Sequence, residues 1–520
     1  MSRKNKISFK ILGINDLMLV LGSGWLLMLS FPKFGTGYLA WVSLVPLFYA
    51  LLRGNKTIPQ ALMLGLVTGL TAQIGIMYWI TDVVVNFGYL PYPVGVAAML
   101  LLSAYLGLYT GIFSAAVVYF RKKDVPLWAA APLLWTCLEY AKSHLLTGFP
   151  WENLGYSQYL QLPLIQIADI TGVYGMTFFI VLINAMIYEV LFIPGTKKML
   201  LAKILVGVGL FMMIYGYGVF RIQEIGRQMT TAPKVAVRIA QGNIDQSVKW
   251  NPQYQLETME IHTALSMRDK PSKPDLIVWP ETAFPAFFQD VNDLHRTVVG
   301  FVKQSGSWLL FGSPTYNRKD NNITLFNSAF LLSPEGTIME KYDKVHLVPY
   351  GEYVPLRRFF PFINKLVEGI GDFGTGPGYR PLTFGPYRVG VLICYEGIFP
   401  GAARTYKQEG ADFLVNLTND AWFGRTSAPY QHLSMTVFRA VENRLDIVRA
   451  ANTGISAFID ATGKMTDTSA LFEMVFLDGK VHINKGRTFY GSQGDVFIYI
   501  CILILMILSA VITLRRKSHD

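Results

Sequence analysis

The chain alternates between long apolar stretches and one long region of mixed polarity. Eight apolar stretches cover residues 12–31, 38–52, 58–80, 93–120, 127–146, 173–193, 199–220 and 496–514. Most approach or exceed the ~20 residues that a helix needs to cross the hydrocarbon core of a bilayer. The pattern predicts a transmembrane domain of about seven helices over 1–220, an α/β domain over 221–494, and a final membrane helix with a short tail over 495–520.

The region from 221 to 494 carries short apolar runs that are rich in β-branched residues and are separated by helix-like segments. The runs are VAVRIAQ at 235–241, DLIVWPE at 275–281, WLLFGS at 308–313, RVGVLICYE at 388–396 and DFLVNLTND at 412–420. The helix-like segments lie near 252–269, 290–305, 398–409 and 429–445. This alternation is typical of an α/β domain with a sheet covered by helices. Two further stretches, NITLFNSAFLLSPEG and ISAFIDATGKM, predict antiparallel hairpins.

The composition supports a membrane protein and argues against a nucleic-acid partner. Only 16% of the residues are charged, against about a quarter in typical soluble proteins, and the mean hydropathy is +0.34. A formal net charge of +11 is compatible with nucleic-acid binding, but residues 221–514 hold 29 Lys and Arg against 27 Asp and Glu. The positive excess therefore lies beside the apolar stretches, where it orients a membrane protein.

Basic residues fall in alternate loops between the apolar stretches. Arg121, Lys122 and Lys123 occupy one such loop, whereas no Lys or Arg stands between Thr81 and Pro93. By the positive-inside rule this asymmetry places the N-terminus in the cytoplasm. Seven crossings then put residues 221–494 on the outer face of the membrane.

Three residues stand where an α/β sheet usually presents its ligands, beyond the carboxyl ends of strands. Glu281 ends DLIVWPE, Cys394 ends RVGVLIC, and Lys344 lies in EKYDKVHLVPYGEYVP after a predicted hairpin. A nucleophilic thiol needs a base and a positive field, which Glu281 and Lys344 are suited to supply. Taken singly, each residue also fits an ordinary structural role.

Metal and nucleotide sites find no support in the sequence. The seven His residues are scattered, and no two stand at ligand spacing beside a third donor. The glycines of TGPG and NDAWFG match no phosphate loop. We therefore expect no metal and no cofactor.

Several motifs together resemble known families. WPETAFP, YDKVHLVPYGEYVP and VLICYEG, in this order, resemble the Glu, Lys and Cys motifs of the carbon-nitrogen hydrolase (nitrilase) superfamily. QGNIDQSVKW, GEYVP and NDAWFG, together with TGFPWENLGYSQ in the apolar part, are similar to the apolipoprotein N-acyltransferase family of Gram-negative-type bacteria. The resemblance implies a nitrilase-like α-β-β-α sandwich on the periplasmic side of the bacterial inner membrane.

The resemblance also implies roles for individual residues. It makes Glu281 the general base, Lys344 the oxyanion-stabilising lysine and Cys394 the acylated nucleophile, while Glu352 in GEYVP matches a further glutamate that the family needs. Positions implicated in substrate handling or in arranging the site are matched by Trp250, Tyr395, Glu396 and Trp422. For these four, core packing of the aromatics and a helix-start charge for Glu396 are the alternative interpretations.

The reaction that the resemblance implies is a ping-pong transfer. An acyl chain passes from a phospholipid, with phosphatidylethanolamine as the favoured donor, through a Cys394 thioester to the α-amine of an S-diacylglyceryl cysteine of a lipoprotein. The expected enzyme is a monomer. A membrane-tethered amidase or nitrilase, which would use water as acceptor, and a non-enzymatic scaffold or transporter are the two alternatives.

Residues 356–378 suggest a route for the lipid. Phe359, Phe360 and Phe362 lie in a short apolar cluster beside Arg357 and Arg358, and a glycine-rich run follows. Our hypothesis is a mobile arm that rests on the outer leaflet, with the arginines at lipid phosphates and the rings below the headgroups. Ordinary core packing of the rings is the alternative.

Overall fold

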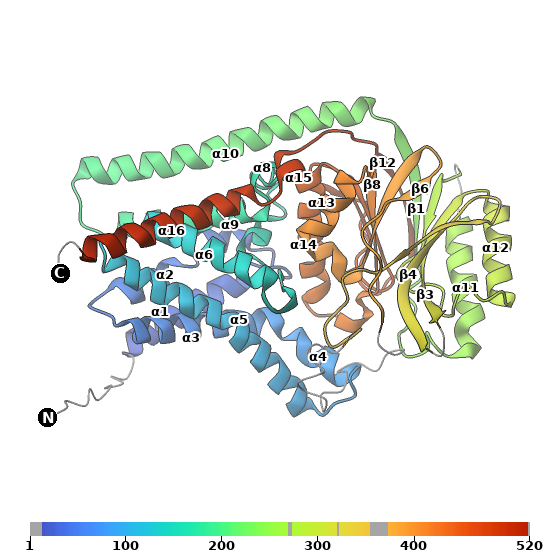
Figure 1. Ribbon diagram of the computed structural model, residues 1–520, viewed down its shortest axis with the longest axis horizontal. Coiled ribbons are helices and arrows are strands. Elements are labelled where there is room, and N and C mark those ends of the chain that lie inside the picture. The colour runs from blue at the N-terminus through green and yellow to red at the C-terminus, as the bar shows by residue number, and fades with distance from the viewer. Residues whose placement is uncertain (1–12, 269–272, 320–321, 354–372, 518–520) are drawn as a thin grey trace.

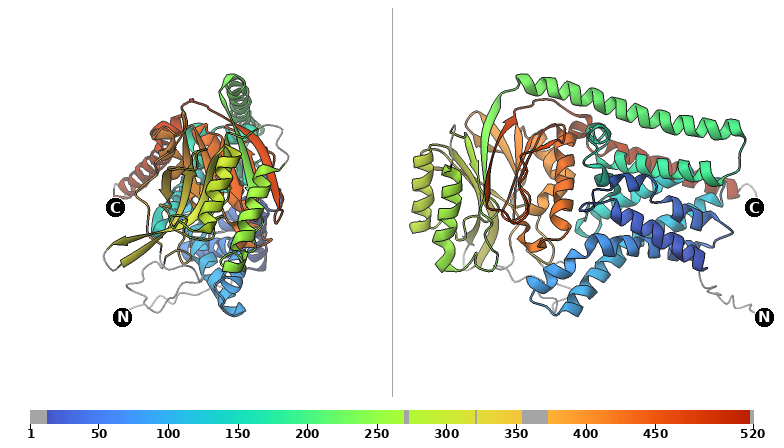
Figure 2. Two further views of the ribbon diagram at one scale, coloured as in Figure 1. Left: turned by 90° about the vertical axis from the view of Figure 1, so that its right-hand side faces the viewer. Right: turned by 180° about the vertical axis from the view of Figure 1, so that it is seen from behind.

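The computed structural model describes residues 13–268, 273–319, 322–353 and 373–517. These residues form a bundle of apolar helices beside an α/β domain, and the two parts pack directly against each other (Figures 1 and 2). The chain builds most of the bundle first, crosses to the α/β domain and returns to the bundle with its last helix.

The bundle contains the helices that the apolar stretches predict. Its main helices are α1 (Ile14–Leu29), α2 (Val45–Leu52), α3 (Ile58–Met77), α5 (Tyr92–Arg121), α6 (Leu127–His144), α9 (Val173–Phe192), α10 (Lys197–Thr231) and α16 (Val496–Lys517). Within the described residues, α3, α5, α9, α10 and α16 are long and apolar enough to cross a membrane. The second stretch is divided between η1 (Gly37–Trp41) and α2, so the count of eight spans stays a prediction.

Short helices complete the bundle on the side of the α/β domain. They are α4 (Trp79–Asn86), η2 (Leu145–Thr147), η3 (Leu154–Gln158), α7 (Leu162–Ile165) and α8 (Ala168–Thr171). The long helix α10 continues to Thr231, past Phe220 where its apolar stretch ends, and it leads the chain along the outside of the bundle into the α/β domain (Figure 1). Most of its apolar side chains are exposed, as expected of a helix that faces lipid, while a few, such as Phe211, pack against the bundle.

Two six-stranded sheets form the centre of the α/β domain. The first has the order β12-β1-β2-β3-β4-β5, and the second has the order β11-β10-β9-β8-β7-β6. The strands of the first sheet are β1 (Lys234–Gln241), β2 (Leu276–Val278), β3 (Trp308–Lys319), β4 (Asn322–Leu332), β5 (Ile338–Asp343) and β12 (Val475–His482). Those of the second are β6 (Leu382–Phe384), β7 (Tyr387–Ile393), β8 (Phe413–Thr418), β9 (Ile447–Ala451), β10 (Ala457–Ile459) and β11 (Met465–Thr466).

Each sheet has a parallel centre and antiparallel edges. Strands β1, β2 and β3 run parallel, as do β7, β8 and β9, whereas the remaining pairings are antiparallel. Helices α11 (Pro252–Met267) and α12 (Asp293–Ser305) cover the first sheet, and α13 (Pro400–Gln408) and α14 (Ala428–Asn443) cover the second (Figure 1). The α-β-β-α sandwich and both predicted hairpins are thereby confirmed.

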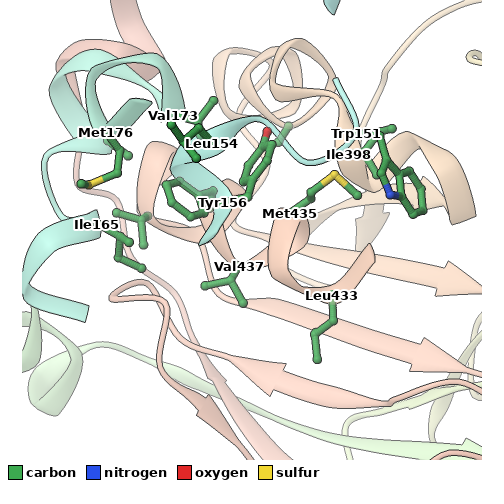
Figure 3. Packing of buried hydrophobic residues seen from close by; sticks show 14 of the residues in the cluster. Trp151, Leu154, Tyr156, Ile165, Val173, Met176, Ile398, Leu433, Met435 and Val437 are labelled. Carbon is green, nitrogen blue, oxygen red and sulfur yellow. The ribbon is translucent and has the colours of Figure 1, made fainter. Parts of the chain in front are cut away.

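Helix α14 lies between the second sheet and the bundle, and all its residues except Tyr430 are buried. Its side chains Leu433, Met435 and Val437 belong to one apolar core with Trp151 and residues 154–176 of the bundle (Figure 3). Just beyond the helix, Arg444 donates to Asp169 of the bundle at 2.7 Å. The α/β domain is therefore joined to the bundle by a shared core.

Candidate active site

The structure brings Glu281, Lys344 and Cys394 together between the two sheets. Glu281 lies three residues after β2, Lys344 directly follows β5, and Cys394 directly follows β7. Their exposed fractions are 6%, 1% and 8%. The charges of Glu281 and Lys344 both act on the pKa of the Cys394 thiol, in opposite directions. Motifs far apart in the sequence thus converge on one buried site.

The Glu281 carboxylate is held by two donors, one on strand β4 and one directly after strand β8. Asn327 on β4 donates its side-chain amide to Oε1 at 2.8 Å, and the backbone N–H of Asn419 donates to Oε2 at 2.8 Å. Burial raises the pKa of Glu281, and the nearby Lys344 ammonium opposes that rise. Gly312 on β3 permits this arrangement, because a Cβ there would come within 2.4 Å of the Thr282 nitrogen.

Lys344 is paired with Glu352, the further glutamate of GEYVP. The Lys344 ammonium lies 2.9 Å from the Glu352 carboxylate, which also accepts from the backbone N–H of Val348 at 2.8 Å. Asn327 donates to Glu352 at 3.0 Å as well as to Glu281, so it bridges the two carboxylates. Although burial favours the neutral amine, Glu352 and Glu281 raise the pKa of Lys344. The lysine therefore keeps its positive charge.

Cys394 has an unusual backbone conformation for its position. Its φ is +51°, in the left-handed region that residues other than glycine seldom adopt. It opens the short helix η4 (Cys394–Ile398), which leads to α13. Burial and the Glu281 charge raise the pKa of the thiol, and Lys344 opposes them. The resting sulfur is therefore protonated, and reaction requires a base.

Glu396 is completely buried and is more than a helix-start charge. Its carboxylate accepts from the Tyr342 hydroxyl and from the backbone N–H groups of Val345, His346 and Ile393 at 2.7 to 3.0 Å. Burial raises its pKa to about 7, and the hydrogen bonds oppose this. Glu396 thus ties the backbone that follows Lys344 to the end of the strand that carries Cys394.

The three predicted aromatic residues lie in different surroundings. Trp250, which precedes the N-cap residue of α11, is 37% exposed. Tyr395 is buried, with its ring 5.0 Å from that of Phe399. Trp422 lies 4.9 Å, centroid to centroid, from Phe87 at the end of α4, and so contacts the bundle. Their suggested roles with substrate remain predictions.

Three residues of the site escaped the sequence reasoning, namely Lys249, Asn327 and Asn419. The buried ammonium of Lys249 donates to the Glu281 backbone carbonyl at 3.3 Å, and burial lowers its pKa to about 8. Lys249 and Asn419 lie inside QGNIDQSVKW and NDAWFG, which were noted as motifs. The motifs did not indicate which of their residues reach Glu281, because these contacts form only through the fold.

The suggested arm falls largely outside the described residues. Phe359, Phe360 and Phe362 belong to the range 354–372, so the hypothesis about them stays a prediction. The chain that follows is attached beside the site, since Gly376 donates its N–H to the Lys344 carbonyl at 2.8 Å.

Comparison with known proteins decides the family. The model described as Apolipoprotein N-acyltransferase N-terminal domain matches residues 23–186, and that described as Carbon-nitrogen hydrolase matches residues 235–480. An apolipoprotein N-acyltransferase of Geobacter metallireducens is 44% identical over 509 residues, which cover 97% of this chain and 96% of the relative. The chain belongs to the apolipoprotein N-acyltransferase family.

A second relative agrees with this assignment. The apolipoprotein N-acyltransferase of Pasteurella multocida is 31% identical over 502 residues, 95% of each chain. A solved carbon-nitrogen hydrolase from Helicobacter pylori G27 is 16% identical, with a TM-score of 0.37, over 48% of this chain and 89% of that one. As a member of the apolipoprotein N-acyltransferase family with several apolar helices, the chain is a membrane-bound acyltransferase, which excludes an inert scaffold.

Proposed function

We propose that this family member acylates the α-amine of the S-diacylglyceryl cysteine at the N-terminus of apolipoproteins, with a phospholipid as donor and Cys394 as the carrier. One observation carries the proposal: Cys394, Glu281 and Lys344 lie together in a buried site. That site belongs to a domain whose core is continuous with the membrane bundle. The names of the relatives support the choice of acceptor.

In the first stage the Cys394 thiol gives its proton to Glu281, and the sulfur attacks the carbonyl carbon of a phospholipid ester. Negative charge develops on the carbonyl oxygen, where the Lys344 ammonium stabilises it. The ester bond then breaks, the alkoxide leaves with the proton from Glu281, and lysophospholipid departs. The Cys394 thioester remains.

In the second stage the α-amine of the lipoprotein attacks the thioester carbonyl carbon. Glu281 accepts a proton from the attacking nitrogen, and Lys344 again meets the oxyanion. The carbon–sulfur bond breaks, and the thiolate recovers the proton. The products are an amide on the lipoprotein and the resting thiol, so no cofactor takes part.

The membrane bundle serves this chemistry because both substrates carry acyl chains. Each buried methylene contributes roughly 0.8 kcal/mol to retention in the bilayer, so the site must come to the lipid. The buried surroundings also keep water from the thioester. We further propose that the enzyme lies in the inner membrane as a monomer with its α/β domain in the periplasm, and that phosphatidylethanolamine is its donor.

Intact-mass analysis of the protein purified from its own membrane tests the proposal. We expect an acyl adduct that disappears in Cys394→Ala and in Cys394→Ser, since a serine hydroxyl is much harder to ionise than a thiol. Addition of a diacylated lipopeptide should discharge the adduct and yield N-acylated peptide. Release of free fatty acid in place of the amide would instead indicate a membrane-bound hydrolase.

A further inference from the structure

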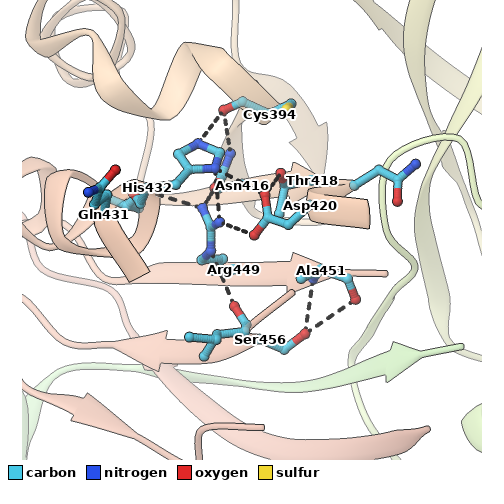
Figure 4. A network of polar contacts seen from close by, with 12 residues as sticks. Cys394, Asn416, Thr418, Asp420, Gln431, His432, Arg449, Ala451 and Ser456 are labelled. Atoms are coloured by element: carbon cyan, nitrogen blue, oxygen red, sulfur yellow. Dashed lines mark hydrogen bonds and ion pairs between the residues drawn. The ribbon is translucent and has the colours of Figure 1, made fainter. Parts of the chain in front are cut away.

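His432 on α14 contacts the backbone of the nucleophile. Its Nε2 lies 3.1 Å from the Cys394 carbonyl oxygen, and the side-chain amide of Asn416 donates to the same oxygen at 3.4 Å (Figure 4). The His432 side chain is only 1% exposed. The mechanism outlined above gives this buried imidazole no task.

The other edge of the ring faces a buried ion pair. Nδ1 lies 3.1 Å from a carboxylate oxygen of Asp420 and 3.1 Å from the guanidinium of Arg449, and these two residues pair at 2.8 Å (Figure 4). Because the Cys394 carbonyl only accepts, Nε2 must carry the hydrogen. In the neutral ring Nδ1 accepts from the Arg449 guanidinium, which also donates to the Asp420 carboxylate and so lies between two acceptors. Burial and the Arg449 charge lower the pKa of His432, in keeping with a neutral ring.

The ring is also fixed from the membrane side. The indole of Trp151 stacks on the imidazole, with centroids 6.1 Å apart and an interplanar angle of 30°. The Phe423 ring meets it edge-on at 6.2 Å. His432 therefore cannot rotate away from Cys394 without disturbing the contact between the α/β domain and the bundle.

The backbone of Cys394 needs such a restraint. A residue other than glycine persists in the left-handed region only where its surroundings determine the conformation, and such residues gather at active sites. If the carbonyl of Cys394 were released, the peptide could rotate toward a common conformation. The sulfur would then leave its place between Glu281 and Lys344.

We propose that His432 is a positioning residue for the nucleophile, held at Nδ1 by Arg449, which Asp420 fixes in turn, and donating from Nε2 to the Cys394 carbonyl. This inference rests on the proposed role of Cys394. The imidazole touches neither substrate nor the reacting atoms and acts through the backbone of Cys394. The alternative is that His432 only contributes to the packing of α14 in the protein core.

Two amide variants of the full-length enzyme separate these possibilities. His432→Gln places an amide N–H near the position of Nε2 and keeps the donor to Cys394, whereas His432→Asn reaches only the position of Nδ1 and loses it. Both replace a ring by an amide, so losses of packing are similar. The measurements are the rate of acyl adduct formation in a single turnover, the rate of Cys394 alkylation by iodoacetamide, and the melting temperature.

We expect His432→Asn to slow acylation and alkylation about tenfold, the effect of one lost hydrogen bond to a buried carbonyl, and His432→Gln to recover most of both rates. The two variants should melt at similar temperatures. Equal rates in Gln and Asn, whether both slow or both normal, would overturn the inference. The alkylation rates decide the matter even if no acyl adduct forms on the parent enzyme, an outcome that would defeat the proposed function instead.

Discussion

Two largely buried clusters in this protein contain the same residue types and differ in the ion pairs and hydrogen bonds that hold their charged groups. The cluster that we propose to be catalytic, called the catalytic cluster below, consists of Glu281, Lys344 and Glu352, and the bundle cluster consists of Glu139, Lys142 and Glu152. In the catalytic cluster the lysine lies 2.9 Å from a carboxylate. Among the described residues no ion pair joins the members of the bundle cluster, and Lys142 donates to the Trp151 carbonyl at 3.1 Å.

The two carboxylates of the bundle cluster are themselves unequal. Glu139 accepts from the backbone N–H of Leu154, the Trp135 indole and the Thr177 hydroxyl at 2.7 to 2.9 Å. Glu152 accepts from the Ser434 hydroxyl at 3.2 Å, and its second oxygen has no partner among the described residues. Lys142, Glu139 and Glu152 line a cavity of about 50 Å³.

The comparison teaches that burial of charge alone does not make a catalytic site. Charges act on a transition state when the protein already holds them in place, because no reorganisation is then needed during the reaction. The catalytic cluster meets this condition through Asn327, Asn419 and Val348, which fix both carboxylates. We expect substitutions in the bundle cluster to change the stability of the protein, each by a different amount, and to leave the reaction rate nearly unchanged.

The largest contrast is expected between the two lysines. Lys344→Met removes the charge that we propose stabilises the oxyanion, so the rate of acyl adduct formation should fall at least ~100-fold. Lys142→Met should lower the melting temperature, yet change the rate per folded enzyme by less than roughly threefold, under 1 kcal/mol in activation free energy. Mass analysis of the acyl adduct after single turnovers measures both. A similar loss of rate in the two variants would erase the distinction between the clusters.

Glu352→Gln should have the next largest effect, because it breaks an ion pair whose lysine is buried and whose carboxylate is only 13% exposed. Removal of one partner from such a pair costs about 3–5 kcal/mol of stability, and the loosened Lys344 should also slow acylation. Asp293→Asn is the control, since it breaks the exposed Arg296–Asp293 pair and should cost less than ~1 kcal/mol. Thermal melting in detergent compares them, and equal shifts would mean that the Lys344–Glu352 pair contributes little.

The buried Glu396 predicts a pH dependence of stability. Its folded pKa of about 7 exceeds the ordinary value of 4.5, so the folded state binds the proton more tightly than the unfolded state. Stability from this group is complete below pH 4.5 and is lost as the pH rises through 7, by about 3 kcal/mol. Glu396→Gln should flatten the fall in melting temperature across this window. An unchanged slope would show that Glu396 ionises normally.

The smallest effect is expected at Glu152. Glu152→Gln keeps an oxygen for Ser434 and removes a charge that burial disfavours, so stability should change by less than ~1 kcal/mol in either direction. Glu139→Gln should cost about 1–3 kcal/mol, because three donors lose a charged acceptor. Melting curves of the two variants are sufficient. A larger loss for Glu152→Gln would show that its carboxylate has a function in the bundle.

The sequence by itself determined the features that depend on local pattern. The apolar stretches located the main helices of the bundle, and β-branched runs located the strands that precede Glu281 and Cys394. These patterns are legible because side chains repeat every 3.6 residues in a helix and every two in a strand. Even so, the break between η1 and α2 and the extension of α10 to Thr231 were not visible in mean hydropathy.

Only the tertiary structure decided which polar groups meet. Asn419 reaches Glu281 across 138 positions of sequence, and Glu396 holds the backbone beside Lys344 from a different sheet. The left-handed conformation of Cys394 and its contact with His432 likewise follow from how α14 is pressed between the second sheet and the bundle. Such contacts produce no repeating pattern in the sequence, because they depend on how the two sheets and their covering helices pack against each other. Burial strengthens each of these contacts, because water no longer competes for the hydrogen bonds or screens the charges of the residues involved.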